Sequence, residues 1–232
     1  MTPKSVLFVD SHIMFREIMI PLLEREFPGY TFITASSIKE ATPLLEHHAF
    51  DLLITDISGL ESPWLSMILQ ARDQSPGTKA IILTSEMSSF WVHRAIREGV
   101  LGIVTKTCPV SELVCAIHSV VEGGKHLSPE IAQKFMQHIS YSQIGNPMNL
   151  LSPRELEIFV QIGHGRRLKS IAKELGLSPC TVAVHKHNIA RKTGIITSAN
   201  IARYCLEHGM LGLKPEQTLL RSPTAEPEAA AA

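Results

Sequence analysis

Four polar residues in the first half of the chain stand at the ends of short apolar runs. They are Asp10, Asp56, Thr84 and Lys106. If the runs are parallel strands, these side chains meet at the carboxyl edge of a sheet, which is where open α/β sheets bind ligands. A carboxylate can attack a phosphoryl donor, and a hydroxyl and an ammonium can then hold the phosphate oxygens. Such a transfer needs a cation such as Mg²⁺ to neutralise charge.

The elements that must position these residues alternate regularly over residues 1–125. The predicted strands are 6–10, 30–35, 52–56, 80–84 and 102–106, and the predicted helices are 13–27, 36–48, 65–74, 88–98 and 109–122. In the first helix, Phe15, Ile18, Met19, Leu22 and Leu23 are expected on one broad face. Five strand–helix repeats with right-handed crossovers predict a doubly wound α/β domain around a five-stranded parallel sheet.

The second half of the chain has a purely helical pattern. Helices are predicted at 153–163, 169–175, 179–193 and 199–208. Ser152 with Glu155 three residues on predicts a capping box, and Gly176 lies in a short turn before the third helix. A helix, a tight turn containing Gly and a second helix with a polar outer face are typical of a helix-turn-helix.

The composition shifts mark the domain boundaries. We expect a first domain at 1–124, a linker at 125–149 with a helix at 129–139, and a four-helix domain at 150–214. The segment 215–232 is rich in Pro, Glu and Ala and is predicted to be a disordered tail.

The net charge of zero hides an asymmetry between these parts. Residues 1–125 carry 10 basic and 14 acidic residues, a net charge of −4, whereas residues 151–214 carry 10 basic and 4 acidic residues, a net charge of +6. The basic part is therefore expected to meet an anionic partner.

Composition also excludes some classes of protein. With 44% hydrophobic and 19% charged residues the chain can bury a core, so wholesale disorder is excluded. No apolar stretch approaches the roughly 18–20 residues that span a bilayer, so no membrane partner is expected. The start of the chain has no secretory-signal pattern, and the four cysteines form no zinc-type cluster, which together favour a cytoplasmic location with reduced thiols.

Residues 4–122 resemble the receiver domain of bacterial response regulators. The resemblance implies that Asp56 is the phosphoacceptor, that Thr84 and Lys106 support the phosphate, and that Mg²⁺ is held by Asp10, Asp56 and Ser58. It also implies a sensor histidine kinase as a partner.

The sequence departs from the receiver pattern at three places. Ser11 stands where the family has a second acid that ligates the metal directly, and a hydroxyl is a poor replacement because Mg²⁺ prefers carboxylates. The loop after Asp56 reads Ile57-Ser58-Gly59-Leu60-Glu61 in place of the family's Met-Pro-Gly pattern, and Ile103 replaces an aromatic switch residue.

The four C-terminal helices resemble the LuxR-type helix-turn-helix of NarL/FixJ response regulators. The resemblance rests on Ser152-Pro153-Arg154-Glu155, Ile171-Ala172, Thr181-Val182, His185 and Lys192-Thr193-Gly194, among others. It implies that the helix 179–193 enters the major groove of double-stranded DNA and that the protein is a homodimer. The expected DNA-binding residues are Arg166, Arg167, Lys169, Ser178, Thr181, Ala183, Val184, Lys186, His187, Arg191 and Lys192.

The sequence leaves open how the two domains work together. One hypothesis is a transcription regulator, not an enzyme, whose receiver controls dimerisation and exposure of the recognition helix. A second is a phosphorylation-independent pseudo-receiver that acts as a protein-interaction module with secondary DNA binding. A third, a small phosphatase-like enzyme using Asp56 and Lys106, lacks a second general acid. The aromatic pair Phe90-Trp91 either covers the core or anchors an interface.

Overall fold

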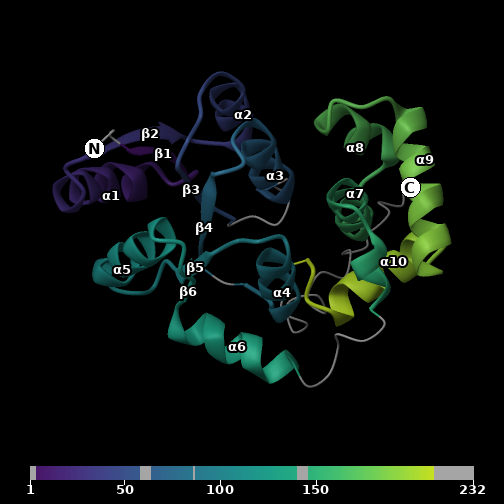
Figure 1. Ribbon diagram of the computed structural model, residues 1–232. Helices are drawn as coiled ribbons and strands as arrows, with labels where there is room; N and C mark the ends of the chain where they lie inside the picture. The colour runs from purple at the N-terminus through teal and green to yellow at the C-terminus, as the bar shows by residue number, and fades with distance from the viewer. Residues whose placement is uncertain (1–3, 58–63, 86, 140–145, 212–232) are drawn as a thin grey trace, which may run out of the picture.

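The computed structural model describes residues 4–57, 64–85, 87–139 and 146–211. Within them the chain forms an α/β domain followed by a helical domain (Figure 1). Ser58 and the predicted tail at 215–232 lie outside the described residues. The described part of the chain contains no helix that is long and apolar enough to cross a membrane.

The first domain is built on a parallel sheet with the strand order β2-β1-β3-β4-β5-β6. The strands are β1 (Lys4–Val9), β2 (Tyr30–Ala35), β3 (Leu52–Asp56), β4 (Lys79–Thr84), β5 (Gly102–Thr105) and β6 (His126–Leu127). All five predicted strands are present, and the two-residue β6 extends the sheet beyond β5. The order reverses direction at β1, as expected of a doubly wound fold.

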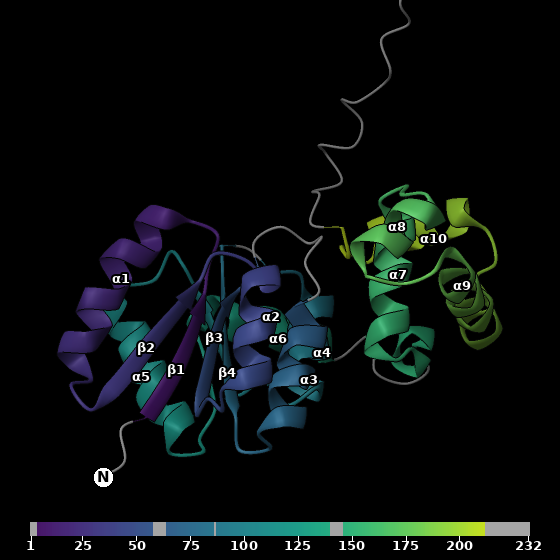
Figure 2. The same ribbon diagram turned by 90° about the horizontal axis from the view of Figure 1, so that it is seen from above.

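Helices cover both faces of this sheet. Helices α1 (Ile13–Glu26) and α5 (Val110–Val121) lie on one face, and α2 (Ile38–His47), α3 (Trp64–Gln74) and α4 (Ser89–Arg97) lie on the other (Figure 2). Successive side chains of a strand point to opposite faces of the sheet. Val6 and Phe8 of β1 therefore pack on the face covered by α1 and α5, and Leu7 and Val9 pack on the opposite face. The strand ends therefore rest on a scaffold that is packed from both sides.

One residue of the broad apolar face predicted for the first helix is not buried. Met19 and Leu23 of α1 are 5% and 0% exposed, but Ile18 is 57% exposed. Residues four apart share a helical stripe, whereas Ile18 points about 100° away from Met19. Because α1 packs on the sheet through one narrow stripe, Ile18 remains in solvent.

The helical domain follows α6 (Pro129–Ile139), which packs against α4. Its elements are a 3₁₀ turn η1 (Pro147–Leu150) and the helices α7 (Pro153–Gly163), α8 (Leu168–Glu174), α9 (Pro179–Thr193) and α10 (Ser198–Glu207). The capping box at the start of α7 is confirmed, since Ser152 and Glu155 each bond the other's backbone N–H. Gly176, in the turn before α9, has a φ of +64°, a backbone conformation that favours glycine.

Candidate functional site

The carboxyl edge of the sheet brings three of the four predicted strand-end residues into contact. Lys106 Nζ lies 2.7 Å from Asp10 Oδ2 and 2.7 Å from Asp56 Oδ2. The side chains of Asp10 and Asp56 are 0% and 3% exposed, so one ammonium compensates two carboxylates that are out of water. We call Asp10, Asp56 and Lys106, together with His12, the acid pocket.

Thr84 lies at the same edge of the sheet. It is the last residue of β4, is fully buried, and pairs in register with Thr105, the residue before Lys106. Asp56 pairs with Leu83, one residue before Thr84. The strands thus place Thr84 at the same edge as Asp56 and Lys106. The roles of these three residues in phosphorylation remain predictions.

His12 belongs to this pocket, although sequence reasoning assigned it no role. Its backbone N–H donates to Asp10 Oδ1 at 2.8 Å. Its ring Nδ1 lies 3.1 Å from Asp10 Oδ1, 3.5 Å from Asp56 Oδ2 and 3.3 Å from Lys106 Nζ. The available signal was its position two residues after Asp10, in the loop at the site's edge.

The helix-turn-helix is formed by α8 and α9. Val182 and Ile189 are fully buried and fix α9 on the domain, so its opposite side faces outward. Exposed positions on that side include Thr181, Ala183, Val184, His187 and Arg191. Figures 1 and 2 show α9 on the side of the helical domain that faces away from the first domain.

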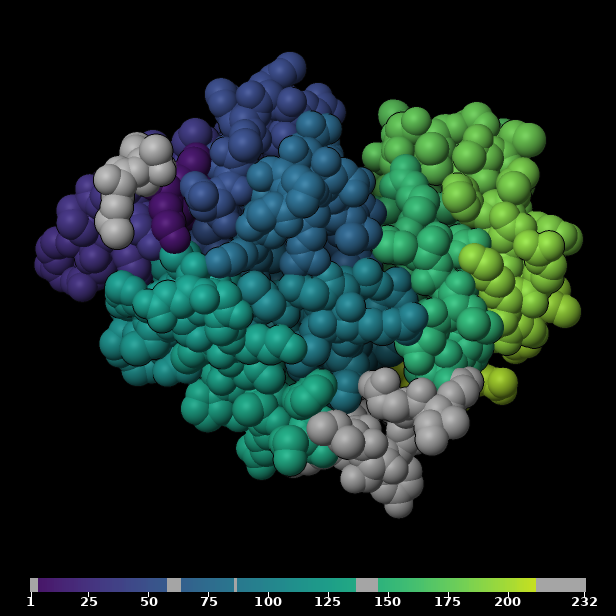
Figure 3. Space-filling view, in the orientation of Figure 1, coloured from purple at the N-terminus to yellow at the C-terminus, as the bar shows by residue number. Residues whose placement is uncertain are grey.

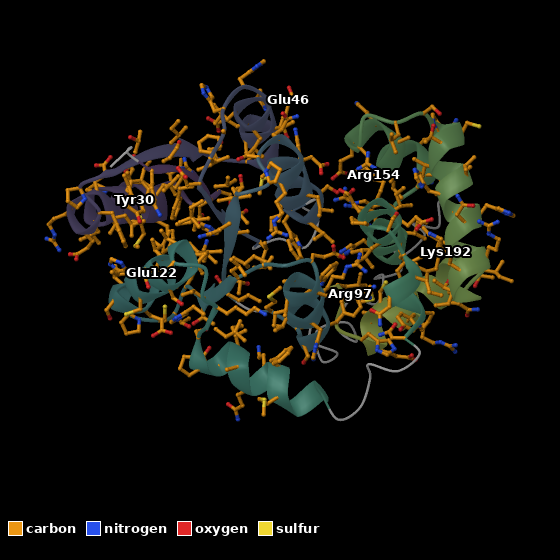
Figure 4. All side chains as sticks on the ribbon, viewed as in Figure 1. Tyr30, Glu46, Arg97, Glu122, Arg154 and Lys192 are labelled. Atoms are coloured by element: carbon orange, nitrogen blue, oxygen red, sulfur yellow. The ribbon has the colours of Figure 1, made fainter. Side chains whose placement is uncertain are left out.

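Two of the predicted DNA-contacting cations are held within the domain. Lys192 Nζ lies 2.6 Å from Glu155 Oε2, which ties the end of α9 to the start of α7, and Arg166 pairs with Glu174. Figure 4 shows Lys192 near the end of α9. Burial raises the pKa of Glu155, but hydrogen bonds from Lys192 and from Ser152 outweigh it and leave that pKa lowered. Lys186 is less constrained, with a contact of 3.4 Å to Ser198 Oγ.

Comparisons with known proteins cover both domains. The family model described as response regulator receiver domain matches residues 6–118, and that described as bacterial regulatory proteins, luxR family, matches residues 149–205. The transcriptional regulatory protein UhpA of Escherichia coli is 31% identical over 199 residues, which cover 86% of this chain and 96% of UhpA. The chain belongs to the response regulator family with a LuxR-type DNA-binding domain.

Other relatives agree with this assignment. The response regulator GacA of Pseudomonas aeruginosa is 30% identical over 209 residues, which cover 89% of this chain and 97% of GacA. The RcsB–DNA complex supports the fold with a TM-score of 0.54 at 20% identity, covering 87% of this chain and 96% of the RcsB chain. The α/β receiver followed by a helical LuxR-type domain is thus the expected architecture.

In this response regulator, helix α4 of the receiver holds the DNA-binding domain. The buried Arg94 donates to the carbonyl oxygens of Met148 and Leu151 at 3.3 and 3.2 Å. Arg97 donates to the carbonyl oxygen of Asn149 at 3.1 Å. We call these three bonds the α4 clasp. Its bonds all end on the turn η1 or on the residue that follows it, so α4 is fixed to the entry of the DNA-binding domain.

Further contacts join the receiver to the DNA-binding domain along the boundary that begins at the α4 clasp. The indole N–H of Trp91 donates to the carbonyl oxygen of Met210 at 3.3 Å, and Trp91 packs edge-on against Trp64. Trp91 is therefore an interface anchor, but one between two domains of the same chain.

Glu157 of α7 lies 3.4 Å from Ser66 of α3 and 2.7 Å from Arg154. Figure 3 shows the two domains meeting along this boundary, and Figure 4 shows Arg97 and Arg154 beside it.

The donor set of the acid pocket only partly suits magnesium. Asp10 and Asp56 supply the hard oxygen ligands that Mg²⁺ prefers. Ser11, in the place of the family's second acid, is exposed, and the pocket's further donor is the nitrogen of His12. The described residues can therefore form a divalent-cation site, but not the all-oxygen set of a typical receiver.

Proposed function

We propose that this response regulator binds double-stranded DNA through α9 as a homodimer in the cytoplasm, and that its receiver controls this binding. The observation that supports DNA binding most strongly is the outward face of α9. His187 and Arg191 are exposed on a helix that is fixed to the domain by Val182 and Ile189, and the half-buried Lys186 lies at the edge of that face. Base pairs are distinguishable in the major groove, and cations along the same helix neutralise the adjacent phosphates.

The test of DNA binding is a charge reversal on α9. Lys186→Glu should raise the Kd for a promoter fragment by about tenfold or more at moderate salt, measured by fluorescence anisotropy. Lys125→Glu is the matched control, because it makes the same charge change on an exposed lysine of the receiver half. Equal losses for both variants would point to nonspecific attraction and would contradict a role for α9.

Within the acid pocket, Asp56 is the proposed phosphoacceptor from a sensor histidine kinase. An oxygen of the Asp56 carboxylate attacks the phosphorus of the kinase's phosphohistidine, the P–N bond breaks and the histidine leaves, and Lys106 and Thr84 then hold the phosphate oxygens. A divalent cation such as Mg²⁺, held by Asp10 and Asp56, would neutralise charge during the transfer.

The α4 clasp supplies the proposed coupling between the pocket and DNA. Thr84 ends β4, and only a short loop separates it from α4, which begins at Ser89. A phosphate that draws Thr84 toward Asp56 would pull on α4, and α4 holds η1 through Arg94 and Arg97. Since α9 already faces solvent while the clasp is closed, the receiver would act on the placement of the DNA-binding domain within the dimer rather than on uncovering α9.

A second candidate function is a pseudo-receiver that regulates without phosphorylation. Ser11 favours it, because the metal site has lost one carboxylate. Incubation with acetyl phosphate and Mg²⁺, followed by intact mass measurement, separates the two. A phosphoryl adduct that disappears in Asp56→Ala supports the phosphoacceptor, whereas the absence of any adduct supports the pseudo-receiver.

A further inference from the structure

We infer that the acid pocket is a transition-metal site in which His12 replaces the missing acid, so that it binds Zn²⁺ in preference to Mg²⁺. The inference deepens the proposed receiver function, on which its biological purpose rests. The binding itself depends on three donor atoms, from Asp10, His12 and Asp56, which lie within 4.8 Å of one another.

The spacing between His12 and each of the two carboxylates fits a small tetrahedral ion. Zinc bonds of 2.0–2.2 Å place two ligands of a tetrahedral ion about 3.4 Å apart. His12 Nδ1 lies 3.1 Å from Asp10 Oδ1 and 3.5 Å from Asp56 Oδ2. Both distances from the imidazole are therefore close to the spacing of two ligands on one ion, and the two carboxylate donors lie within 4.8 Å of each other.

The local backbone holds His12 in this place. The N–H of His12 donates to the same Asp10 Oδ1 that lies near its ring, and this fixes the loop over the pocket. The His12 side chain is 57% exposed, so an ion can enter from solvent and keep a water at its fourth position. Asp10 Oδ2 is buried and makes no hydrogen bond of ordinary geometry within the described residues, although Lys106 Nζ is 2.7 Å away.

The chemistry of the donors decides which ion is preferred. Imidazole nitrogen suits zinc and its transition-metal neighbours, whereas Mg²⁺ favours oxygen ligands and near-octahedral geometry. Exchange of a carboxylate for an imidazole should thus weaken Mg²⁺ binding and retain Zn²⁺ binding. The ammonium of Lys106 opposes any dication, because it already compensates both carboxylates.

The test is isothermal titration calorimetry of the full chain with Zn²⁺ alone and with Mg²⁺ alone. We expect one equivalent of Zn²⁺ to bind at least about tenfold more tightly than Mg²⁺. His12→Ala should weaken this Zn²⁺ binding by about tenfold or more and change Mg²⁺ binding little. Because His12 is exposed, the variant should keep its fold, which near-UV circular dichroism checks.

Two further variants keep the result specific. His47→Ala removes an exposed histidine from the last turn of α2 and should leave Zn²⁺ binding as in the wild type. Lys106→Met removes the opposing charge and should tighten the binding of both ions. Zn²⁺ affinity that is unchanged in His12→Ala, or lost equally in His47→Ala, would overturn the inference.

These outcomes separate the metal site from the proposed phosphorylation. Zinc binding that depends on His12, without any phosphoryl adduct on Asp56, would retain the metal site and remove the phosphoacceptor role. An adduct formed with Mg²⁺, without Zn²⁺ binding at His12, would do the reverse.

Discussion

The acid pocket and the outer face of α9 use their positive charges in opposite ways. Lys106 is 9% exposed and lies between two buried carboxylates, whereas His187 and Arg191 face solvent from a helix that turns away from the receiver. A buried cation is committed to its neighbours, because removing a partner leaves an uncompensated charge. An exposed cation remains available to an external anion such as a phosphate group.

The same contrast recurs within the DNA-binding domain. Lys192 and Arg191 are adjacent, yet Lys192 is paired with Glu155 and Arg191 is exposed. The net charge of this domain therefore overstates how many of its cations can reach DNA. The positions of ion pairs, and not the sum of charges, determine the number of phosphate contacts.

The largest effect is expected from breaking the α4 clasp. Arg94→Met leaves the buried carbonyl oxygens of Met148 and Leu151 and the carboxylate of Glu98 without their guanidinium partner. The free energy of unfolding should fall by about 3 kcal/mol, measured by urea denaturation. Arg97→Met is the matched control, because its single bond to Asn149 is exposed, and it should cost clearly less. Equal losses of unfolding free energy in the two variants would mean that the buried hydrogen bonds of Arg94 stabilise the protein no more than the exposed bond of Arg97.

A smaller loss of unfolding free energy is expected when Glu155 is changed to Gln. The variant weakens both the ion pair with Lys192 and the capping box at Ser152, at a cost of about 1–2 kcal/mol at pH 7. Hydrogen bonds lower the pKa of Glu155 in the folded protein despite the opposing effect of burial. Its stabilisation is therefore fully present above the unfolded-state pKa and is lost as the pH falls through the folded-state pKa. A pH series of urea denaturations should show this acid-side loss in the wild type and less of it in the variant.

The smallest effect on the free energy of unfolding is expected for Glu157→Gln, and its sign is opposite to that of the two preceding variants. Burial at the domain boundary raises the pKa of Glu157, although Arg154 and Ser66 partly offset it. Its ionised form is thus less favourable in the folded than in the unfolded state, and protonation as the pH falls relieves this cost. Glu157→Gln should leave the free energy of unfolding at pH 7 unchanged or raise it by less than about 1 kcal/mol. A loss as large as that of Glu155→Gln would contradict this difference.

The elements that hold the chemistry follow from local sequence rules. Strands β2 and β3 and helices α6, α7 and α9 have the bounds that periodicity, caps and glycines predict, and Asp56 and Lys106 meet because parallel strands end at one edge. The exposure of Ile18 and the strand β6 were not foreseen. The width of the buried stripe on α1 and the pairing of a two-residue strand both depend on neighbouring elements.

The parts of the site that escaped prediction depend on contacts between distant segments. Nothing in the local pattern of α4 indicates that Arg94 reaches the carbonyl oxygens of residues 54 and 57 positions later. His12 could have been suspected from its place in the loop after Asp10, but its distance to Asp56 required the fold. Likewise, the pairing of Lys192 with Glu155 across 37 residues cannot be read from either helix alone.

DNA binding through the exposed cations of α9 is tested most directly by its salt dependence, measured by fluorescence anisotropy on one promoter fragment. The slope of log Kd against log salt concentration counts the phosphates that are neutralised. Arg191→Met should lower this slope by about 1, whereas Lys192→Met should leave it nearly unchanged, because Lys192 is held by Glu155. Binding without salt dependence, or a slope that falls for Lys192→Met and not for Arg191→Met, would contradict DNA binding through the exposed cations of α9.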